Sequence, residues 1–194
     1  MDFKIDALQK IAAEYKKNFS TVSEEEIYKW EAVQCFQEHW DINAVDFQEM
    51  LSRSLEKSFN LLDSRFIYPK GMIITFAEKD PEAVRSMFRD LYDETKDIVA
   101  RIEAFIESAS YLLSKYGEDS WKKHYQNTNS VSVYLFFRFP EKYYIYKYQK
   151  FKDMATKIGY TQLPKMGKNE SVIDYFEMCN AIRDYIVTDQ ELCR

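Results

Sequence analysis

Residues 130–139 read SVSVYLFFRF, Pro140 and Glu141 follow, and residues 142–148 read KYYIYKY. Both runs are dense in β-branched and aromatic residues, which strands favour, and the Pro-Glu pair between them has the composition of a short turn. The pattern predicts a β-hairpin, or a small sheet, around residues 130–148. This stretch decides the fold class, because helical patterns fill most of the chain around it.

Helical periodicity runs through residues 1–116, where apolar residues recur every three to four positions. Asp80-Pro81 predicts one helix start, because aspartate caps a helix and proline suits its first position. The stretch from Ser23 to Glu26 has the sequence of a capping box and predicts another. A further helix is expected at residues 150–158, where Gly159 can end it. We therefore expect a mainly helical protein that the hairpin makes α+β.

The 194 residues are in the range of one domain and suffice to bury a core. Within this single domain we expect three parts. Residues 1–116 form a helical scaffold, residues 117–168 form a basic, aromatic-rich part that contains the strands, and residues 169–194 form a C-terminal helix. Residues 188–194 contain no clear helix terminator, so we expect the chain to be cut from a longer polypeptide.

Cysteine use argues against a metal site. Cys35, Cys179 and Cys193 lie far apart, with no C-x-x-C pair and no histidines at zinc-finger spacing. The chain begins with an amphipathic pattern instead of a secretory signal, and no apolar run approaches the roughly 18 residues of a membrane span. The sequence predicts a cytoplasmic protein without membrane contact and without a metal or other cofactor.

Charge is distributed unevenly, although the net charge is only −5. Residues 121–168 hold ten Lys and Arg against two Asp and Glu, together with twelve aromatic residues. Lysines neutralise phosphates, and aromatic rings stack on unpaired or flipped bases, so this basic block is the candidate nucleic-acid surface. The alternative is that the rings belong to the core and that the lysines protect edge strands from aggregation.

We expect cations of the basic block to hold the DNA backbone. These candidates are Lys122, Lys123, Arg138, Lys142, Lys147, Lys150 and Lys152. One or two aromatic rings of the same block are expected to meet a base. These candidates are Trp121, Tyr125, Tyr144, Tyr146 and Tyr148. On a strand, the last three tyrosines share one face and Lys147 lies on the other.

Signals for catalysis are missing from the sequence. It contains no phosphate-binding glycine loop, and its two histidines, His39 and His124, lack a second ligand at helical spacing. Solvated helix faces account for the carboxylates, and the hairpin holds too few acids to bind Mg²⁺. We therefore expect no catalytic residues. A hydrolase with an unrecognised acidic pair stays open as a third alternative.

Several runs resemble the N-terminal region of McrB-type AAA+ proteins, which are subunits of modification-dependent restriction systems. These runs are YKWEAV at 28–33, FQEHWDI at 36–42, VRSMFRDLYDE at 84–94, HYQN at 124–127 and RFPEKYYIYK at 138–147. The resemblance spans about residues 25–155. It implies a DNA-reading N-terminal domain, often one that receives a flipped, modified base in an aromatic pocket. No site residue carries over from the family.

The resemblance also implies partners. A C-terminal AAA+ motor, which hydrolyses GTP in the best-known members, would follow this domain and join it to a McrC-type nuclease subunit. The expected function is a specificity domain for double-stranded DNA, unmodified or modified. The alternative is a non-catalytic interaction module of an anti-phage AAA+ ATPase. In that case Asp90, Asp93, Glu94 and Asp97 are exposed for a protein partner.

Overall fold

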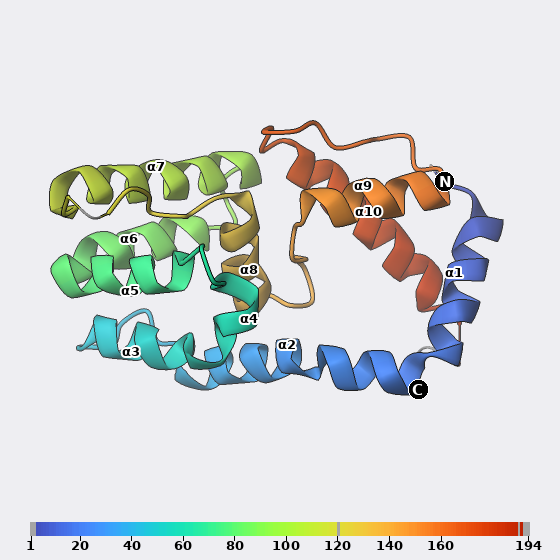
Figure 1. Cartoon of the computed structure of the whole chain (residues 1–194), viewed down its shortest axis with the longest axis horizontal. Coiled ribbons are helices and arrows are strands. Elements are labelled where there is room, and N and C mark those ends of the chain that lie inside the picture. Colours follow the sequence, from blue (N-terminus) through green and yellow to red (C-terminus); the bar gives the residue numbers. More distant parts are fainter. Residues whose placement is uncertain (1–2, 120, 190, 192–194) are drawn as a thin grey trace. The chain divides into compact units, whose positions relative to one another are not determined.

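The computed structural model describes residues 3–119, 121–189 and 191 (Figure 1). The chain divides into two compact units. Tyr28–Ile145 form one, here named the central unit, and Met1–Ile27 together with Tyr146–Arg194 form the other, here named the terminal unit. The terminal unit thus combines segments from both ends of the chain. The single-domain, three-part organisation stays a prediction.

The predicted α+β class is wrong, because the regular elements formed by the described residues are all helical. The run at residues 130–139 lies almost entirely in helix α8 (Thr128–Arg138). Residues 143–147 have no regular secondary structure, so the second predicted strand is not formed. The strand argument that placed the tyrosines of residues 144–148 on one face is therefore wrong as well.

Helix α8 is buried on all sides, which explains why its sequence resembles a strand. Residues 130–137 are all buried. A helix that is apolar all round has no 3.6-residue period, so periodicity cannot distinguish it from a buried strand. Burial of each large apolar side chain contributes about 1.5–3 kcal/mol. The helix propensity of Val, Phe or Tyr is at most about 0.7 kcal/mol worse than that of Ala, so packing outweighs the strand preference.

A capping box fixes the start of α8. The backbone N–H of Ser130 donates to Oδ1 of Asn127 over 3.1 Å, and the backbone N–H of Asn127 donates to Oγ of Ser130 over 2.9 Å. This reciprocal pair satisfies two amide groups that the first helical turn would otherwise leave unpaired. The capping residue Asn127 therefore favours a helix, whereas the β-branched and aromatic residues that follow it favour a strand.

Of the two predicted helix starts, one is confirmed and one is wrong. Asp80 caps α6 (Pro81–Leu91) by accepting from the backbone N–H of Ala83 over 3.1 Å. Ser23 instead lies inside α2 (Phe19–His39), where its hydroxyl donates to the carbonyl of Ser20. The capping-box sequence at Ser23 is not used, because α2 continues through it.

The central unit has an aromatic core. Helices α5 (Pro69–Lys79), α6 and α7 (Ile98–Tyr116) lie side by side, and α8 packs against α7 and α4 (Phe59–Leu62) (Figure 1). The Phe88 ring meets Phe105 and Tyr134 edge-on, with centroid distances of 5.2 and 5.3 Å. The other elements of this unit are most of α2, α3 (Phe47–Ser54) and the 3-10 turn η1 (Glu56–Ser58).

Hydrogen bonds join the two chain segments of the terminal unit. Besides the first residues of α2, this unit contains α1 (Ile5–Lys17), α9 (Tyr148–Ile158) and α10 (Ser171–Ile186). The backbone N–H of Lys4 donates to the carbonyl of Ile158 over 2.7 Å, and the Lys16 ammonium pairs with Asp189 at 2.7 Å. The predicted end of α9 is confirmed, since Gly159 follows it with a φ of +65°, a conformation that glycine adopts easily.

Candidate functional site

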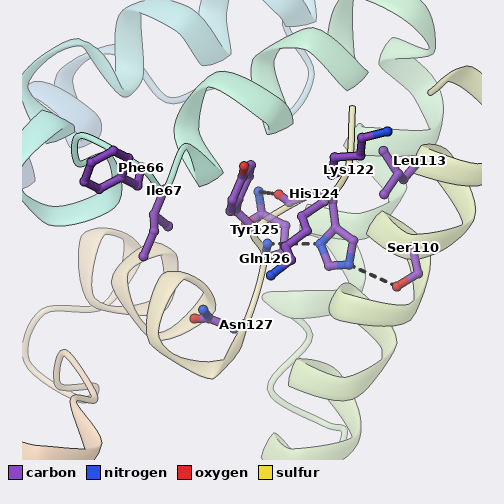
Figure 2. Close-up of a pocket in the computed structure, with 10 residues that line it drawn as sticks. Phe66, Ile67, Ser110, Leu113, Lys122, His124, Tyr125, Gln126 and Asn127 are labelled. Atoms are coloured by element: carbon purple, nitrogen blue, oxygen red, sulfur yellow. Dashed lines mark hydrogen bonds between the residues drawn. The ribbon is translucent and has the colours of Figure 1, made fainter. Parts of the chain in front are cut away.

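A cavity of about 620 Å³ opens in the central unit where three segments meet. These are the loop before α5, the C-terminal half of α7 and the connection from α7 to α8 (Figure 2). The lining residues are Phe66, Ile67, Ser110, Leu113 and residues 122–127. Three of the residues predicted to contact DNA, Lys122, Lys123 and Tyr125, therefore lie together at one pocket.

Tyr125 has a backbone conformation that residues other than glycine rarely adopt. Its φ is +59°, the only positive φ of a non-glycine residue in the part of the chain that the structure describes. This left-handed conformation costs roughly 1–2 kcal/mol and persists only where the surroundings enforce it. The Tyr125 ring meets the Tyr68 ring edge-on at 6.0 Å. Because such strain concentrates at ligand sites, Tyr125 marks this connection as a candidate site.

Gln126 is buried and anchors the strained segment. Its Nε2 donates to the carbonyl of Pro69 over 2.7 Å, and its Oε1 accepts from the hydroxyls of Tyr134 at 3.2 Å and Ser130 at 3.3 Å. Burial raises the pKa of Tyr134 far above its ordinary value, so this hydroxyl keeps its proton and donates. The Gln126 side chain thus joins the connection between α7 and α8 to α5 and to the body of α8.

His124 and Ser110 form a hydrogen-bonded pair at the pocket. The backbone N–H of Gln126 donates to Nδ1 of His124 over 3.0 Å, so the neutral imidazole carries its proton on Nε2. That proton is donated to Oγ of Ser110 over 3.1 Å, and the Ser110 hydroxyl donates to the carbonyl of Ile106. A serine nucleophile needs the reverse arrangement, with an unprotonated Nε2 that accepts the hydroxyl proton. The pair therefore holds the pocket wall together instead of activating Ser110.

The charge at the pocket is positive. Its described lining contains no Asp or Glu, whereas Lys122 and Lys123 are both exposed there. The Lys122 ammonium donates to the carbonyl of Asp119 over 2.9 Å. Burial lowers the pKa of His124, which keeps the imidazole neutral, so the two lysines supply the positive charge. Cations beside an aromatic ring suit a ligand that combines a planar ring with negative charge, and a nucleotide has both.

Outside the pocket lining lie four other predicted residues of the central unit: Trp121, Arg138, Lys142 and Tyr144. Trp121 is half-buried and packs edge-on against Phe76 at 6.5 Å. Arg138 is exposed at the end of α8. Lys142 pairs with Glu94, and this ion pair raises the pKa of Lys142 and lowers that of Glu94. Its positive charge is thus offset by a neighbour.

The remaining predicted residues lie in or beside α9 and in the segment before it. Lys147, Lys150 and Lys152 are exposed in the terminal unit. Tyr146 is buried against Tyr175, with a centroid distance of 5.4 Å. Tyr148 is half-buried, and so is Tyr144 near the end of the central unit. The predicted residues are thus divided between the two units, and the pocket brings together Lys122, Lys123 and Tyr125.

Sequence reasoning missed several pocket residues. Ser110 lies 14 residues before His124 and carries no motif. From the sequence, His124 is tested only as a metal ligand, whereas the structure places it in the pocket wall. The one available signal was the run from Phe66 to Tyr68, three large apolar residues in succession within a loop. Such a run in a loop indicates either burial or a binding surface.

Other kinds of site are not found in the described residues. They contain no group of three or more His, Cys, Asp or Glu side chains that could hold a metal ion, and none of their helices has the length and apolar composition for crossing a membrane. A second cavity, of about 310 Å³, lies in the terminal unit and is lined mainly by apolar side chains of α1, α9 and α10. Comparison with known protein families, curated proteins and solved structures finds no match to this chain.

Proposed function

We propose that this chain is a DNA-binding specificity domain whose central-unit pocket receives a base turned out of the duplex. One observation carries the proposal: Lys122, Lys123 and the strained Tyr125 line a single pocket without a described carboxylate. The sequence resemblance to McrB-type proteins supports the same function. It also implies an AAA+ motor and a McrC-type nuclease subunit as partners of the whole protein.

Each pocket group has a role in this proposal. The ammonium groups of Lys122 and Lys123 neutralise phosphates next to the extruded base, which releases counterions and makes binding salt-dependent. The Tyr125 ring stacks on the base, a contact worth about 1–3 kcal/mol. The cavity of about 620 Å³ is in the range of pockets that bind small organic ligands and has room for a base with its sugar. Phosphate contacts give affinity, and the pocket gives discrimination between bases.

The hydrogen bonds of the pocket favour binding over catalysis. The Ser110 hydroxyl accepts a hydrogen bond from Nε2–H of His124 and donates one to the carbonyl of Ile106, so neither side chain is arranged for nucleophilic attack. The acidic interaction surface of the alternative proposal is also partly neutralised. Asp90 and Asp93 both pair with Lys96, and Glu94 pairs with Lys142. These ion pairs leave less free negative charge for a basic protein partner.

The direct test is fluorescence anisotropy with labelled duplexes at two salt concentrations. The duplexes are unmodified or carry 5-methylcytosine, 5-hydroxymethylcytosine or N6-methyladenine. We expect Tyr125→Ala to abolish any preference among them while weak, salt-sensitive binding remains. The double variant Lys122→Glu/Lys123→Glu should weaken binding to all duplexes equally and reduce the slope of log K against log salt by about two.

A matched control is Lys57→Glu/Lys79→Glu, which makes the same change in charge at exposed lysines of the same unit, outside the pocket lining. If this control weakens binding as much as the pocket variant, the pocket is not the DNA site. If the wild-type protein binds no duplex at low salt, the DNA function is rejected and the protein-interaction module takes its place.

A further inference from the structure

The loop between α4 and α5 exposes large apolar side chains at the pocket rim. Phe66 is 73% exposed, and its neighbours Ile67 and Tyr68 are 49% and 45% exposed. Phe66 and Ile67 also line the pocket that contains Lys122 and Tyr125. In Figure 2, Phe66 and Ile67 lie on one side of Tyr125, and His124 with Ser110 lies on the other. An apolar cluster of this kind at a cationic pocket indicates a contact surface.

Hydrogen bonds within the loop hold Phe66 in its exposed position. The backbone N–H of Ser64 donates to the carbonyl of Ile67 over 2.8 Å, and the Tyr68 hydroxyl donates to the carbonyl of Arg65. The backbone N–H of Lys70 donates to Oδ1 of Asp63 over 2.9 Å, which ties the start of the loop to the first turn of α5. The exposure of Phe66 is thus built into the loop conformation.

The loop is also attached to the strained connection across the pocket. Gln126 donates to the carbonyl of Pro69, directly after the loop, and the Tyr125 ring packs against Tyr68. The Phe66 and Tyr125 rings are therefore carried by two segments that are bonded to each other. The hydrogen bond and the ring contact hold the two segments beside the same pocket.

We propose that Phe66 is a wedge that enters the duplex and fills the gap left when a base turns into the pocket beside Tyr125. This inference rests on the proposed function and deepens it by naming the residue that opens the stack. Turning a base out requires unstacking, and proteins that distort DNA insert apolar side chains between base steps to stabilise the opened step. The exposed Phe66 ring lies at the rim of a pocket with room for a base and its sugar, so it is placed to stabilise the opened step.

Charge around the ring favours a nucleic acid over an apolar protein partner. The Arg65 guanidinium lies 5.2 Å from the centroid of the Phe66 ring, and Lys122 and Lys123 line the same pocket. Interspersed cations and exposed rings match a phosphate backbone that alternates with base faces. The described pocket lining contains no carboxylate that would repel it.

The test uses two labelled duplexes, one fully paired and one with a single mismatch that lowers the cost of turning a base out. Both carry 2-aminopurine next to the mismatch position, because its fluorescence rises when a base step is unstacked. We expect the wild-type protein to bind the mismatched duplex more tightly and to raise its fluorescence. Phe66→Ala should lose that rise and bind the mismatched duplex about tenfold more weakly or worse, whereas Phe66→Leu keeps most of both.

Two controls separate a wedge from a general apolar contact. Phe59 is 58% exposed on α4 and does not line the pocket, so Phe59→Ala should behave as wild type. A labelled single strand has no gap to fill, so Phe66→Ala should bind it nearly as well as the wild-type protein does. Equal losses for Phe59→Ala and Phe66→Ala, or equal losses on duplex and single strand, would overturn the inference.

Failure of the wedge is distinguishable from failure of the proposed function. If the wild-type protein binds no duplex, the DNA function and the wedge are both rejected. If Lys122→Glu/Lys123→Glu weakens duplex binding but Phe66→Ala changes neither affinity nor fluorescence, the pocket remains the DNA site and only the wedge is rejected. Circular dichroism of each variant checks the fold, and an exposed phenylalanine is not expected to be required for it.

Discussion

The backbone N–H of Gln126 donates to Nδ1 of His124 over 3.0 Å, across the strained residue Tyr125. This bond needs an unprotonated Nδ1, because a protonated imidazole presents a donor at both nitrogens. If His124 were protonated, its Nδ1–H would face the backbone N–H of Gln126, and the hydrogen bond between them would be lost. The conformation of the connection from α7 to α8 therefore depends on the charge of one imidazole.

We predict that folding stability falls on mild acidification through His124. Burial lowers its pKa in the folded protein below the ordinary value of 6.5, so the unfolded chain binds the proton more readily. The contribution of neutral His124 is fully present above about pH 6.5 and is lost as the pH falls through the lower, folded pKa. His124→Asn keeps an oxygen that can accept from the Gln126 N–H and does not titrate. It should flatten this part of the profile.

Urea unfolding at a series of pH values measures this effect. His39→Asn is the control, since it removes the other histidine of the chain and should leave the His124 contribution in place. An unchanged pH profile for His124→Asn would contradict the prediction.

We predict that Gln126→Ala destabilises the protein by about 2–4 kcal/mol. The substitution leaves the carbonyl of Pro69 and the buried hydroxyl of Tyr134 without the partner that Gln126 provides. Tyr134→Phe is the matched variant. It removes one hydroxyl and leaves Gln126 bonded to Pro69 and Ser130, so we expect a loss of only about 0.5–1.5 kcal/mol. Urea titration of the two variants gives the comparison, and similar losses would show that Gln126 is not the anchor.

We predict that stability and base discrimination separate at Tyr125. Tyr125→Gly relieves the left-handed strain and should stay within about 1 kcal/mol of wild-type stability or exceed it. Tyr125→Val places a β-branched residue at positive φ and should lose about 1–3 kcal/mol. Both variants lack the ring, so both should lose base preference in anisotropy. A strongly destabilised Tyr125→Gly would mean that the ring is needed for folding.

We predict that Asp80→Ala destabilises the protein by about 1–2 kcal/mol, whereas Asp80→Asn costs less, because asparagine also caps helices. The Asp80 carboxylate accepts from the Ala83 N–H and, at 2.9 Å, from the Tyr116 hydroxyl. The Tyr116 hydrogen bond, followed by that from Ala83, lowers the pKa of Asp80. Its contribution is present above the ordinary carboxyl pKa and is lost as the pH falls through the folded value. Acid titration of stability should therefore be shallower for Asp80→Asn.

Part of the site was accessible from the sequence. Charge and aromatic density selected the block that contains Lys122, Lys123 and Tyr125, because those properties depend on composition alone. The same criterion also selected Tyr146, which is buried in the terminal unit against Tyr175. Composition cannot distinguish a ring in the core from a ring at a pocket, because the same aromatic residue types occur in both places.

The fold class, like the site, could be predicted only in part from the sequence. Asp80-Pro81 and Gly159 predicted a helix start and a helix end correctly, because a cap is a local hydrogen bond and a left-handed φ is a local backbone preference. Residues 130–139 were assigned to a strand because their composition is β-branched and aromatic. Residues 130–138 instead lie in α8, where packing by distant segments buries residues 130–137, and such burial cannot be recognised in a local sequence window.

The sequence by itself determined the helix start at Asp80, the helix end at Gly159, the uneven charge and the presence of a basic, aromatic-rich block, since each depends on neighbours in the chain. Only the tertiary structure decided that residues 130–138 are helical, that the chain divides between residues 27 and 28 and between 145 and 146, and that Phe66 lines the same pocket as Tyr125. Those features depend on contacts between residues far apart in sequence. Their free energy comes from burial and from hydrogen bonds such as that of Gln126 to Pro69, which span 57 residues of the chain.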